Sequence, residues 1–450
     1  MAAQKHGHRS RFFRDTFFGR STWITAILVV SISVTGIWIP KLGAMAPFIG
    51  IGGLVLMVLD ALALRGVAKG LDARRDCADR FSNGDVNPIR ITISNSSALS
   101  TTCVVYDELP IPFQHRLPAL TMVVPGSQTA TETYAIRPTR RGEYSFGVLN
   151  VFCRTRLGFL ERRVVVAARR TVAVYPSYFS LGKVGLLAEA AARTGSRTVR
   201  RIGNTMEFEK IKTYVSGDDI RTINWQATAR RGGLMVNQYQ DEREQSIYSV
   251  IDTGRVMKMP FEGMALLDYA INASLALSTT ILSRGDRAGL ITFGAKSGRA
   301  VRADKRSRQV QMLNEVLYGI ETDYSESDDR HLLTAAASVA SSRSLMIVFT
   351  NIESRTAAKR RLPGLLTLAR RHLVLVVLFR NTEVEALQRT QPMRPSDVYL
   401  QTVANDAVRQ KAEIRAEFHR HGIRTLLTRP GDLSVDIVNA YLGLKRSGVI

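Results

Sequence analysis

Two uncharged apolar runs lie close together near the start of the chain. They cover residues 23–39 and 42–59, with only Pro40 and Lys41 between them. Each run approaches the length that a helix needs to cross a hydrocarbon core of about 30 Å. Neither run has a polar face, which disfavours helices buried in the core of a soluble protein. The pattern therefore predicts a transmembrane hairpin with helices over residues 23–39 and 42–64.

Basic residues flank this predicted hairpin on one side. Residues 1–22 form a basic N-terminus and a second basic segment follows residue 64, whereas the loop between the runs carries Lys41 alone. Because basic flanks stay on the inner side, we expect both termini and all soluble domains in the cytoplasm, at the inner (plasma) membrane. A signal peptide is the competing interpretation, since residues 44–46 (AMA) have the small-x-small form of a cleavage site. The second run would anchor the chain in either case.

A β-rich segment follows over residues 80–176. Ile89, Ile91 and Ile93 alternate with polar residues, which is the period of a half-buried strand. Further short apolar runs are separated by clusters of Pro, Gly, Asn and Asp, which are typical of turns. About six or seven short strands over roughly a hundred residues favour a β-sandwich of immunoglobulin-like type.

Strands and helices alternate over residues 245–450. The expected strands cover 247–251, 288–293, 345–349, 373–379 and 423–427, and the expected helices cover 264–282, 310–320, 332–340 and 404–421. This alternation is typical of an α/β domain with a doubly wound, mostly parallel sheet. Ligands of such sheets bind beyond the carboxyl ends of the strands. Asp252 and Asn351 fall at two of these ends.

The chain is also strongly basic, which raises the question of an acidic partner. Its 450 residues contain 62 Lys plus Arg and 39 Asp plus Glu, a formal net charge of +23. Such a charge fits nucleic acid, an anionic membrane or an acidic protein. Residues 136–236 hold 19 basic and 7 acidic residues, and residues 1–80 hold 11 and 5. This distribution favours a membrane-proximal and partner-facing role over nucleic-acid binding.

The most informative segment is residues 203–244, a linker between the two folded regions. It crowds polar, aromatic and turn-forming residues together at Tyr214, Gly217, Asp218, Asp219, Arg221, Asn224, Trp225, Thr228 and Arg230. We expect Asp218 or Asp219 to cap a short helix. Arg221 and Arg230 would then pair with carboxylates beneath Trp225. Two interpretations remain open, an internal clamp between domains and an exposed interaction site.

This segment resembles the signature of the domain of unknown function 58 family. The run YVSGDDIRTINWQATARRGGLMV carries the likeness, and residues 140–147 (RRGEYSFG) and 157–159 (LGF) support it. The resemblance implies a bacterial membrane-anchored protein that accompanies a MoxR-type AAA+ ATPase. It also implies that residues 245–450 form a von Willebrand factor type A-like domain. In one departure, residues 154–156 (RTR) lack the acidic residue that the family carries there.

The same resemblance implies a metal site after the first strand of that domain. Its pattern is Asp-x-Ser-x-Ser, joined by a Thr and an Asp from two later loops around a Mg²⁺ ion. Asp252 keeps the first position, but Gly254 and Val256 replace the two serines. A later loop reads Thr350-Asn351, with an amide where a carboxylate would stand. We therefore expect a degenerate metal site that does not function, with Mg²⁺ as the one cofactor in question.

Other catalytic patterns are missing from the sequence. It contains no GxxxxGK[ST], HExxH or GxSxG segment, so we expect no enzyme. We expect instead a membrane-anchored, cytoplasm-facing adaptor that partners a MoxR-type AAA+ ATPase in the assembly or maturation of another complex. The alternatives are a Mg²⁺-dependent binding module that uses the Asp252 loop and, with less support, a nucleic-acid-binding protein.

Overall fold

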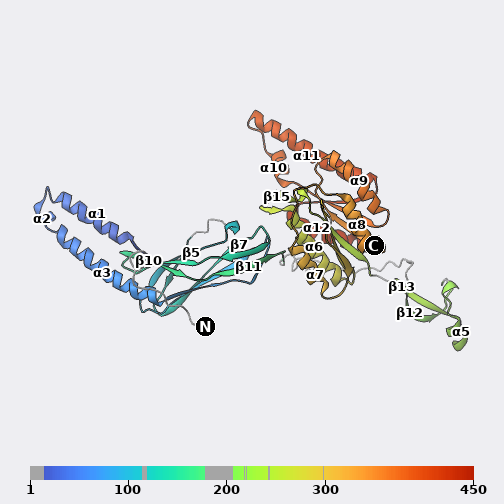
Figure 1. Cartoon of the computed structure of the whole chain (residues 1–450), viewed down its shortest axis with the longest axis horizontal. Coiled ribbons are helices and arrows are strands. Elements are labelled where there is room, and N and C mark those ends of the chain that lie inside the picture. Colours follow the sequence, from blue (N-terminus) through green and yellow to red (C-terminus); the bar gives the residue numbers. More distant parts are fainter. Residues whose placement is uncertain are drawn as a thin grey trace. The chain divides into compact units, whose positions relative to one another are not determined.

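The computed structural model describes residues 15–113, 119–177, 206–216, 218, 220–241, 244–296 and 298–450. It divides into two compact units, Met1–Tyr175 and Pro176–Ile450, and each is described by itself (Figure 1). The protein is a multidomain chain of mixed α/β structure with a β-sandwich in its first unit. At this level the predicted fold class is confirmed.

After the short strand β1 (Thr16–Phe18), the first unit has two apolar helices that lie side by side as a hairpin (Figure 1). α1 covers Arg20–Thr35, α3 covers Ala46–Gly70, and the short helix α2 (Pro40–Gly43) lies between them. Within the described residues, Pro40–Gly70 is the one helical stretch long and apolar enough to cross a membrane, and α1 is a shorter apolar helix. α3 continues beyond residue 64, its predicted end, because Leu64 lies in the sandwich core and Ala68 packs against that core.

The sandwich is built from three sheets. A five-stranded sheet has the order β1-β10-β9-β5-β6, and two three-stranded sheets have the orders β2-β4-β7 and β3-β11-β8. The strands are β1 (Thr16–Phe18), β2 (Leu71–Asp76), β3 (Arg80–Ser82), β4 (Asn87–Asn95), β5 (Thr101–Asp107), β6 (Leu120–Val124), β7 (Gln128–Ile136), β8 (Gly142–Phe146), β9 (Leu149–Arg154), β10 (Leu160–Val166) and β11 (Arg170–Tyr175). Ile89, Ile91 and Ile93 on β4 are fully buried, as their alternation predicts. β1 and β2 lie before residue 80, where the predicted β-rich segment begins. They belong to the sandwich because they pair with β10 and β4.

The loop between β9 and β10 fixes both helices to the sandwich. Asp60 on α3 is fully buried, and its Oδ2 accepts a hydrogen bond from the Leu160 backbone N–H at 2.9 Å. Its Oδ1 accepts from the Thr155 hydroxyl. The Gly19 N–H, just before α1, donates to the Phe159 carbonyl at 2.7 Å. These buried polar contacts make the helical hairpin and the sandwich one continuous structure.

The second unit contains a six-stranded sheet with the order β18-β17-β14-β19-β20-β21. The strands are β14 (Ser246–Asp252), β17 (Arg287–Phe293), β18 (Ala300–Asp304), β19 (Leu345–Phe349), β20 (Leu373–Phe379) and β21 (Arg424–Thr428). Neighbouring strands are parallel except for β17 and β18, which are antiparallel. The predicted doubly wound, mostly parallel sheet is therefore present.

Helices cover both faces of this sheet. α6 (Leu266–Ser283), α7 (Gln309–Tyr318) and α12 (Leu433–Arg446) contribute to one apolar core, and α8 (Asp329–Val339), α9 (Arg355–Ala369) and α11 (Pro395–Arg420) contribute to the other. A further helix, α10 (Thr382–Arg389), packs on α11. Sequence analysis missed α9, α10, α12 and β18, and α11 begins at Pro395 rather than at residue 404. α9 contains Pro363 in its interior. Because proline usually ends a helix, the sequence pattern does not predict a helix there.

Candidate functional sites

The signature segment forms a two-stranded hairpin with a small helix at its tip (Figure 1). Strands β12 (Met206–Thr213) and β13 (Met235–Asp241) pair antiparallel, and a 3-10 turn (Ile220–Thr222) and helix α5 (Trp225–Arg231) lie between them. The Tyr214 N–H donates to the Leu234 carbonyl at 2.8 Å and closes the tip. The signature residues from Tyr214 to Arg230 thus gather between the two strands. Gly217 and Asp219 lie outside the described residues.

Polar signature residues hold α5 against the strands. Asn224 caps α5, because its Oδ1 accepts from the Ala227 N–H at 3.0 Å, and its Nδ2 donates to Asn237 Oδ1 at 2.9 Å. The Thr228 hydroxyl accepts from the Met235 N–H at 3.0 Å. Gly232, with φ +67°, ends the helix in a left-handed conformation that favours glycine. Asn224 and Thr228 therefore build the tip.

Asp218 was one of two residues expected to cap a short helix, but it does not cap α5. Its Oδ1 accepts from Lys212 Nζ at 2.7 Å and its Oδ2 accepts from the Val215 N–H at 3.0 Å. These hydrogen bonds, that from Lys212 first, lower the pKa of Asp218. The carboxylate therefore shapes the turn that precedes α5.

Apolar and basic side chains at the tip are exposed to solvent. Trp225 is 69% exposed, and Ile220 and Val215 are exposed to a similar extent. Arg230 and Arg231 are exposed in the last turn of α5. Trp225 was expected to cover Arg221 and Arg230, but most of its surface is accessible. The tip thus presents an exposed aromatic side chain at the start of α5 and two exposed arginines at its end.

The second predicted site lies at the carboxyl edge of the parallel sheet. Asp252 is the last residue of β14 and is fully buried. Its Oδ1 accepts from the Gly254 N–H at 2.9 Å and from the Ser327 hydroxyl. Its Oδ2 accepts from the Thr350 hydroxyl at 2.7 Å and from Arg361 Nη2. Each carboxylate oxygen of Asp252 therefore has two donors.

Arg361, which extends from α9, is the cation of this site. Its Nη2 pairs with Asp252 and its Nη1 pairs with Asp329, the first residue of α8. Its guanidinium carbon lies 5.2 Å from the ring centroid of Phe293, within the range of a cation–π contact. Burial raises the pKa of Asp329, and Arg361 opposes that rise. One guanidinium thus joins β14, α8 and α9.

Ser327 supplies a hydroxyl beside Asp252, close to Gly254, which stands at a serine position of the metal-site pattern. A Cβ on Gly254 would lie only 2.1 Å from Ser327 Oγ, so a side chain at residue 254 would collide with that hydroxyl. Val256, at the other replaced serine position, packs against the apolar core. The hydroxyl beside Asp252 therefore comes from a different loop of the chain.

Asn351 contacts a different cation, the ammonium group of Lys411. Lys411 Nζ donates to Asn351 Oδ1 and to the Ile352 carbonyl, each at 2.8 Å. The Asn351 amide nitrogen donates to Glu353 Oε1 at 2.9 Å. Burial lowers the pKa of Lys411, and Glu353 acts in the opposite direction. The amide thus binds a lysine and a carboxylate.

These residues do not fit a Mg²⁺ ion. Arg361 and Lys411 already occupy the oxygens of Asp252 and Asn351, and a metal would need those lone pairs. No group of three or more His, Cys, Asp or Glu is placed to hold a metal within the described part of the chain. Sequence analysis identified Asp252, Thr350 and Asn351 but missed Ser327, Asp329, Arg361 and Lys411. Only the acidic start of α8 gave a local signal, since the two cations come from helices distant in sequence.

Some solved structures are similar to part of the chain. The CARDB domain of PF1109 from Pyrococcus furiosus is 15% identical, with 23% of this chain and 94% of that chain covered and a TM-score of 0.17. The PapD-like domain 7 of human CEP192 is 7% identical, with 25% and 87% covered and a TM-score of 0.17. The putative ApaA protein of Bordetella pertussis is 13% identical, with 23% and 93% covered and a TM-score of 0.18. At these scores the likenesses carry no functional argument.

A curated relative and a family model match parts of the chain by sequence. The uncharacterized protein YeaD of Bacillus subtilis (strain 168) is 24% identical over 169 residues, which are 37% of this chain and 40% of that protein. This chain thus matches less than half the length of that relative. Residues 210–425 match the family model described as Protein of unknown function DUF58, which confirms the resemblance seen in the signature segment. Over residues 210–425, therefore, the chain is similar to the DUF58 family.

Proposed function

We propose that this protein is a membrane-anchored, cytoplasm-facing adaptor that binds a MoxR-type AAA+ ATPase and serves the assembly or maturation of another complex. In this proposal the protein binds and positions its partner and has no enzymatic activity of its own. The carrying observation is the exposed tip of the signature hairpin, where Trp225 at the start of α5 and Arg230 and Arg231 at its end are exposed.

The tip has the chemistry of a protein interaction site. Trp and Arg carry much of the binding energy at protein interfaces, because they combine large contact area with directional hydrogen bonds. Ile220 and Val215 add exposed apolar surface around Trp225. Two exposed arginines favour a partner with an acidic patch. Asn224 and Thr228 hold the tip in shape, which lowers the entropy cost of binding.

The second unit would act as a von Willebrand factor type A-like module. The support is its parallel sheet with helices on both faces and its first strand, β14, which ends at a buried Asp252. In this proposal the module folds around Arg361 and Lys411 and needs no metal ion.

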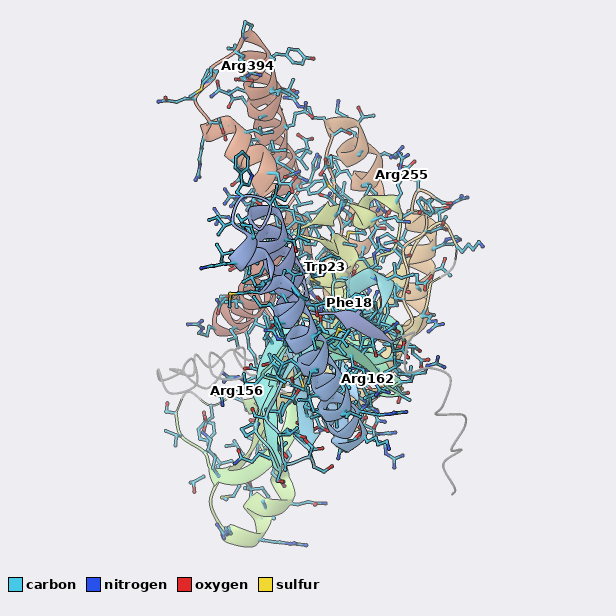
Figure 2. The ribbon with its side chains drawn as sticks, turned by 90° about the vertical axis from the view of Figure 1, so that its left-hand side faces the viewer. Phe18, Trp23, Arg156, Arg162, Arg255 and Arg394 are labelled. Atoms are coloured by element: carbon cyan, nitrogen blue, oxygen red, sulfur yellow. The ribbon has the colours of Figure 1, made fainter. Side chains whose placement is uncertain are left out.

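Both apolar helices of the first unit would cross the bilayer, with both chain ends and the soluble units in the cytoplasm. Trp23 and Trp38 bracket the first apolar run and are exposed, as expected for aromatic side chains at the two membrane interfaces. Phe18 on β1 is exposed close in sequence to Trp23 (Figure 2). The basic flanks of the hairpin support this orientation.

Capture from native membranes tests the proposed partner. Full-length tagged protein, extracted in mild detergent from its own host, should recover a MoxR-type AAA+ ATPase identified by mass spectrometry. Trp225→Ala should reduce that recovery at least about tenfold, because it removes the large apolar contact at the tip. Tyr399→Ala is the matched control, since Tyr399 on α11 is an equally exposed aromatic residue, 71% accessible.

The control must recover as much ATPase as the wild-type protein. Repeated recovery of no such ATPase from membranes that contain it would refute the proposed partner. Equal losses in Trp225→Ala and Tyr399→Ala would refute the assignment of the hairpin tip.

A further inference from the structure

One buried guanidinium lies among oxygen atoms that come from three separate segments. Asp252 ends β14, Ser327 and Asp329 flank the start of α8, and Thr350 follows β19. Arg361 pairs with both carboxylates, and its Nη2 lies 3.5 Å from the Thr350 hydroxyl oxygen. Two carboxylates and the Thr350 hydroxyl therefore surround a single cationic group, and the Ser327 hydroxyl donates to one of those carboxylates, Asp252.

Such a donor set resembles what a hard divalent cation binds. Mg²⁺ and Mn²⁺ take carboxylate and hydroxyl oxygens and complete their coordination with water. Here the positive charge comes from the protein. The Arg361 side chain is 13% exposed, and Phe293 covers one side of its guanidinium. Asp252 is fully buried, and a buried carboxylate requires a cation close by.

We propose that Arg361 takes the place of a divalent cation, so that the carboxyl edge of the sheet is neutralised and held together without metal. The guanidinium links the end of β14 to the first residue of α8 through its two terminal nitrogens. A metal ion at this place would have to displace a side chain that is anchored in α9. The loops around Asp252 consequently keep one arrangement whether or not metal is present.

Thermal unfolding of the full-length protein in lipid nanodiscs tests this proposal. The melting temperature is measured with EDTA and then with millimolar Mg²⁺ or Mn²⁺. The wild-type value should shift by less than about 1 °C, because no site is open to the metal. Arg361→Ala should lower the melting temperature by about 5–10 °C in EDTA, since it leaves buried carboxylates without a cation. Mn²⁺ or Mg²⁺ should then recover part of that loss.

Two further variants show whether any recovery occurs at this site. Arg360→Ala removes the neighbouring, exposed arginine of α9, which pairs with Glu326, and should change neither stability nor metal response. Asp252→Ala combined with Arg361→Ala should show no recovery with metal. Arg361→Gln retains side-chain bulk and provides a second neutral variant in case Arg361→Ala does not fold.

Two results would overturn the proposal. The first is a metal-dependent rise in the wild-type melting temperature that Asp252→Asn abolishes, because the site would then bind metal with Arg361 present. The second is a lack of metal recovery in both Arg361→Ala and Arg361→Gln, because the guanidinium would then not stand where a cation can bind.

Discussion

At the scale of single residues, buried charges in both units are neutralised by partners far away in the chain. Asp252 can be singled out from sequence because it ends an apolar strand, but Arg361 lies 109 residues later and has no local signal. In the sandwich, Arg75 Nε donates to Asp107 Oδ2 at 2.9 Å. Sequence patterns show which charges are buried at strand ends, whereas the fold determines what pairs with them.

Arg75 also offers a direct test of a buried ion pair. Its Nη1 donates to the Ala168 carbonyl at 2.6 Å, its guanidinium lies over the Phe146 ring, and the side chains of Arg75 and Asp107 are almost fully buried. Arg75→Ala leaves Asp107 without its cation and should lower the free energy of unfolding of the sandwich by about 3–5 kcal/mol. Urea unfolding, followed by far-ultraviolet circular dichroism, measures this loss.

The adjacent arginine provides the control for that experiment. Arg74 pairs with Asp76, but its side chain is 79% exposed, so Arg74→Ala should cost no more than about 1 kcal/mol. Similar losses for the two variants would contradict the role assigned to the buried pair.

At the scale of elements, sequence patterns identified the segments whose periodicity is undisturbed. The fully apolar strands β19 and β20 and the alternating strand β4 appear at the expected places. β1 was missed because it has only three residues, too few to show a period. α3 extends past its predicted end because its last turns belong to the sandwich core rather than to the apolar run. The residue that caps α5 is Asn224. Its amide also donates to Asn237 on β13, a contact that depends on β13 pairing with β12.

The helical hairpin gives a prediction at the same scale. If α1 and α3 both cross the bilayer, Lys41 in α2 lies on the outer side of the membrane. Lys41→Cys in a Cys77→Ser background should react with a membrane-impermeant maleimide in intact spheroplasts, since Cys103 and Cys153 are fully buried. Labelling that requires permeabilisation would show that the hairpin does not cross.

A second cysteine position controls the topology experiment. Ser396 is exposed at the start of α11 in the second unit. Ser396→Cys should react only after permeabilisation, because the soluble units face the cytoplasm in the proposed orientation. Labelling of Ser396→Cys in intact spheroplasts would contradict that orientation.

At the scale of the whole molecule, the proposed function assigns membrane anchoring to the first unit and partner binding to the second. The buried contacts of Asp60 tie the apolar helices to the sandwich, so these helices and the sandwich form one body. The second unit carries the DUF58 match over residues 210–425 and displays the signature residues on the β12–β13 hairpin. The sequence predicted these regions and their order, because each has its own composition and period. Its net charge of +23 is consistent with an anionic membrane and an acidic partner.

The affinity of the reconstituted protein for its partner tests the central claim most directly. Full-length protein in nanodiscs is titrated with the purified MoxR-type ATPase of the same organism, and Kd is measured by biolayer interferometry. We expect binding that Trp225→Ala weakens at least about tenfold, equivalent to about 1.4 kcal/mol, while Tyr399→Ala leaves Kd unchanged. A wild-type protein that shows no binding at tens of micromolar ATPase, or that binds equally well with Trp225→Ala, would contradict the account.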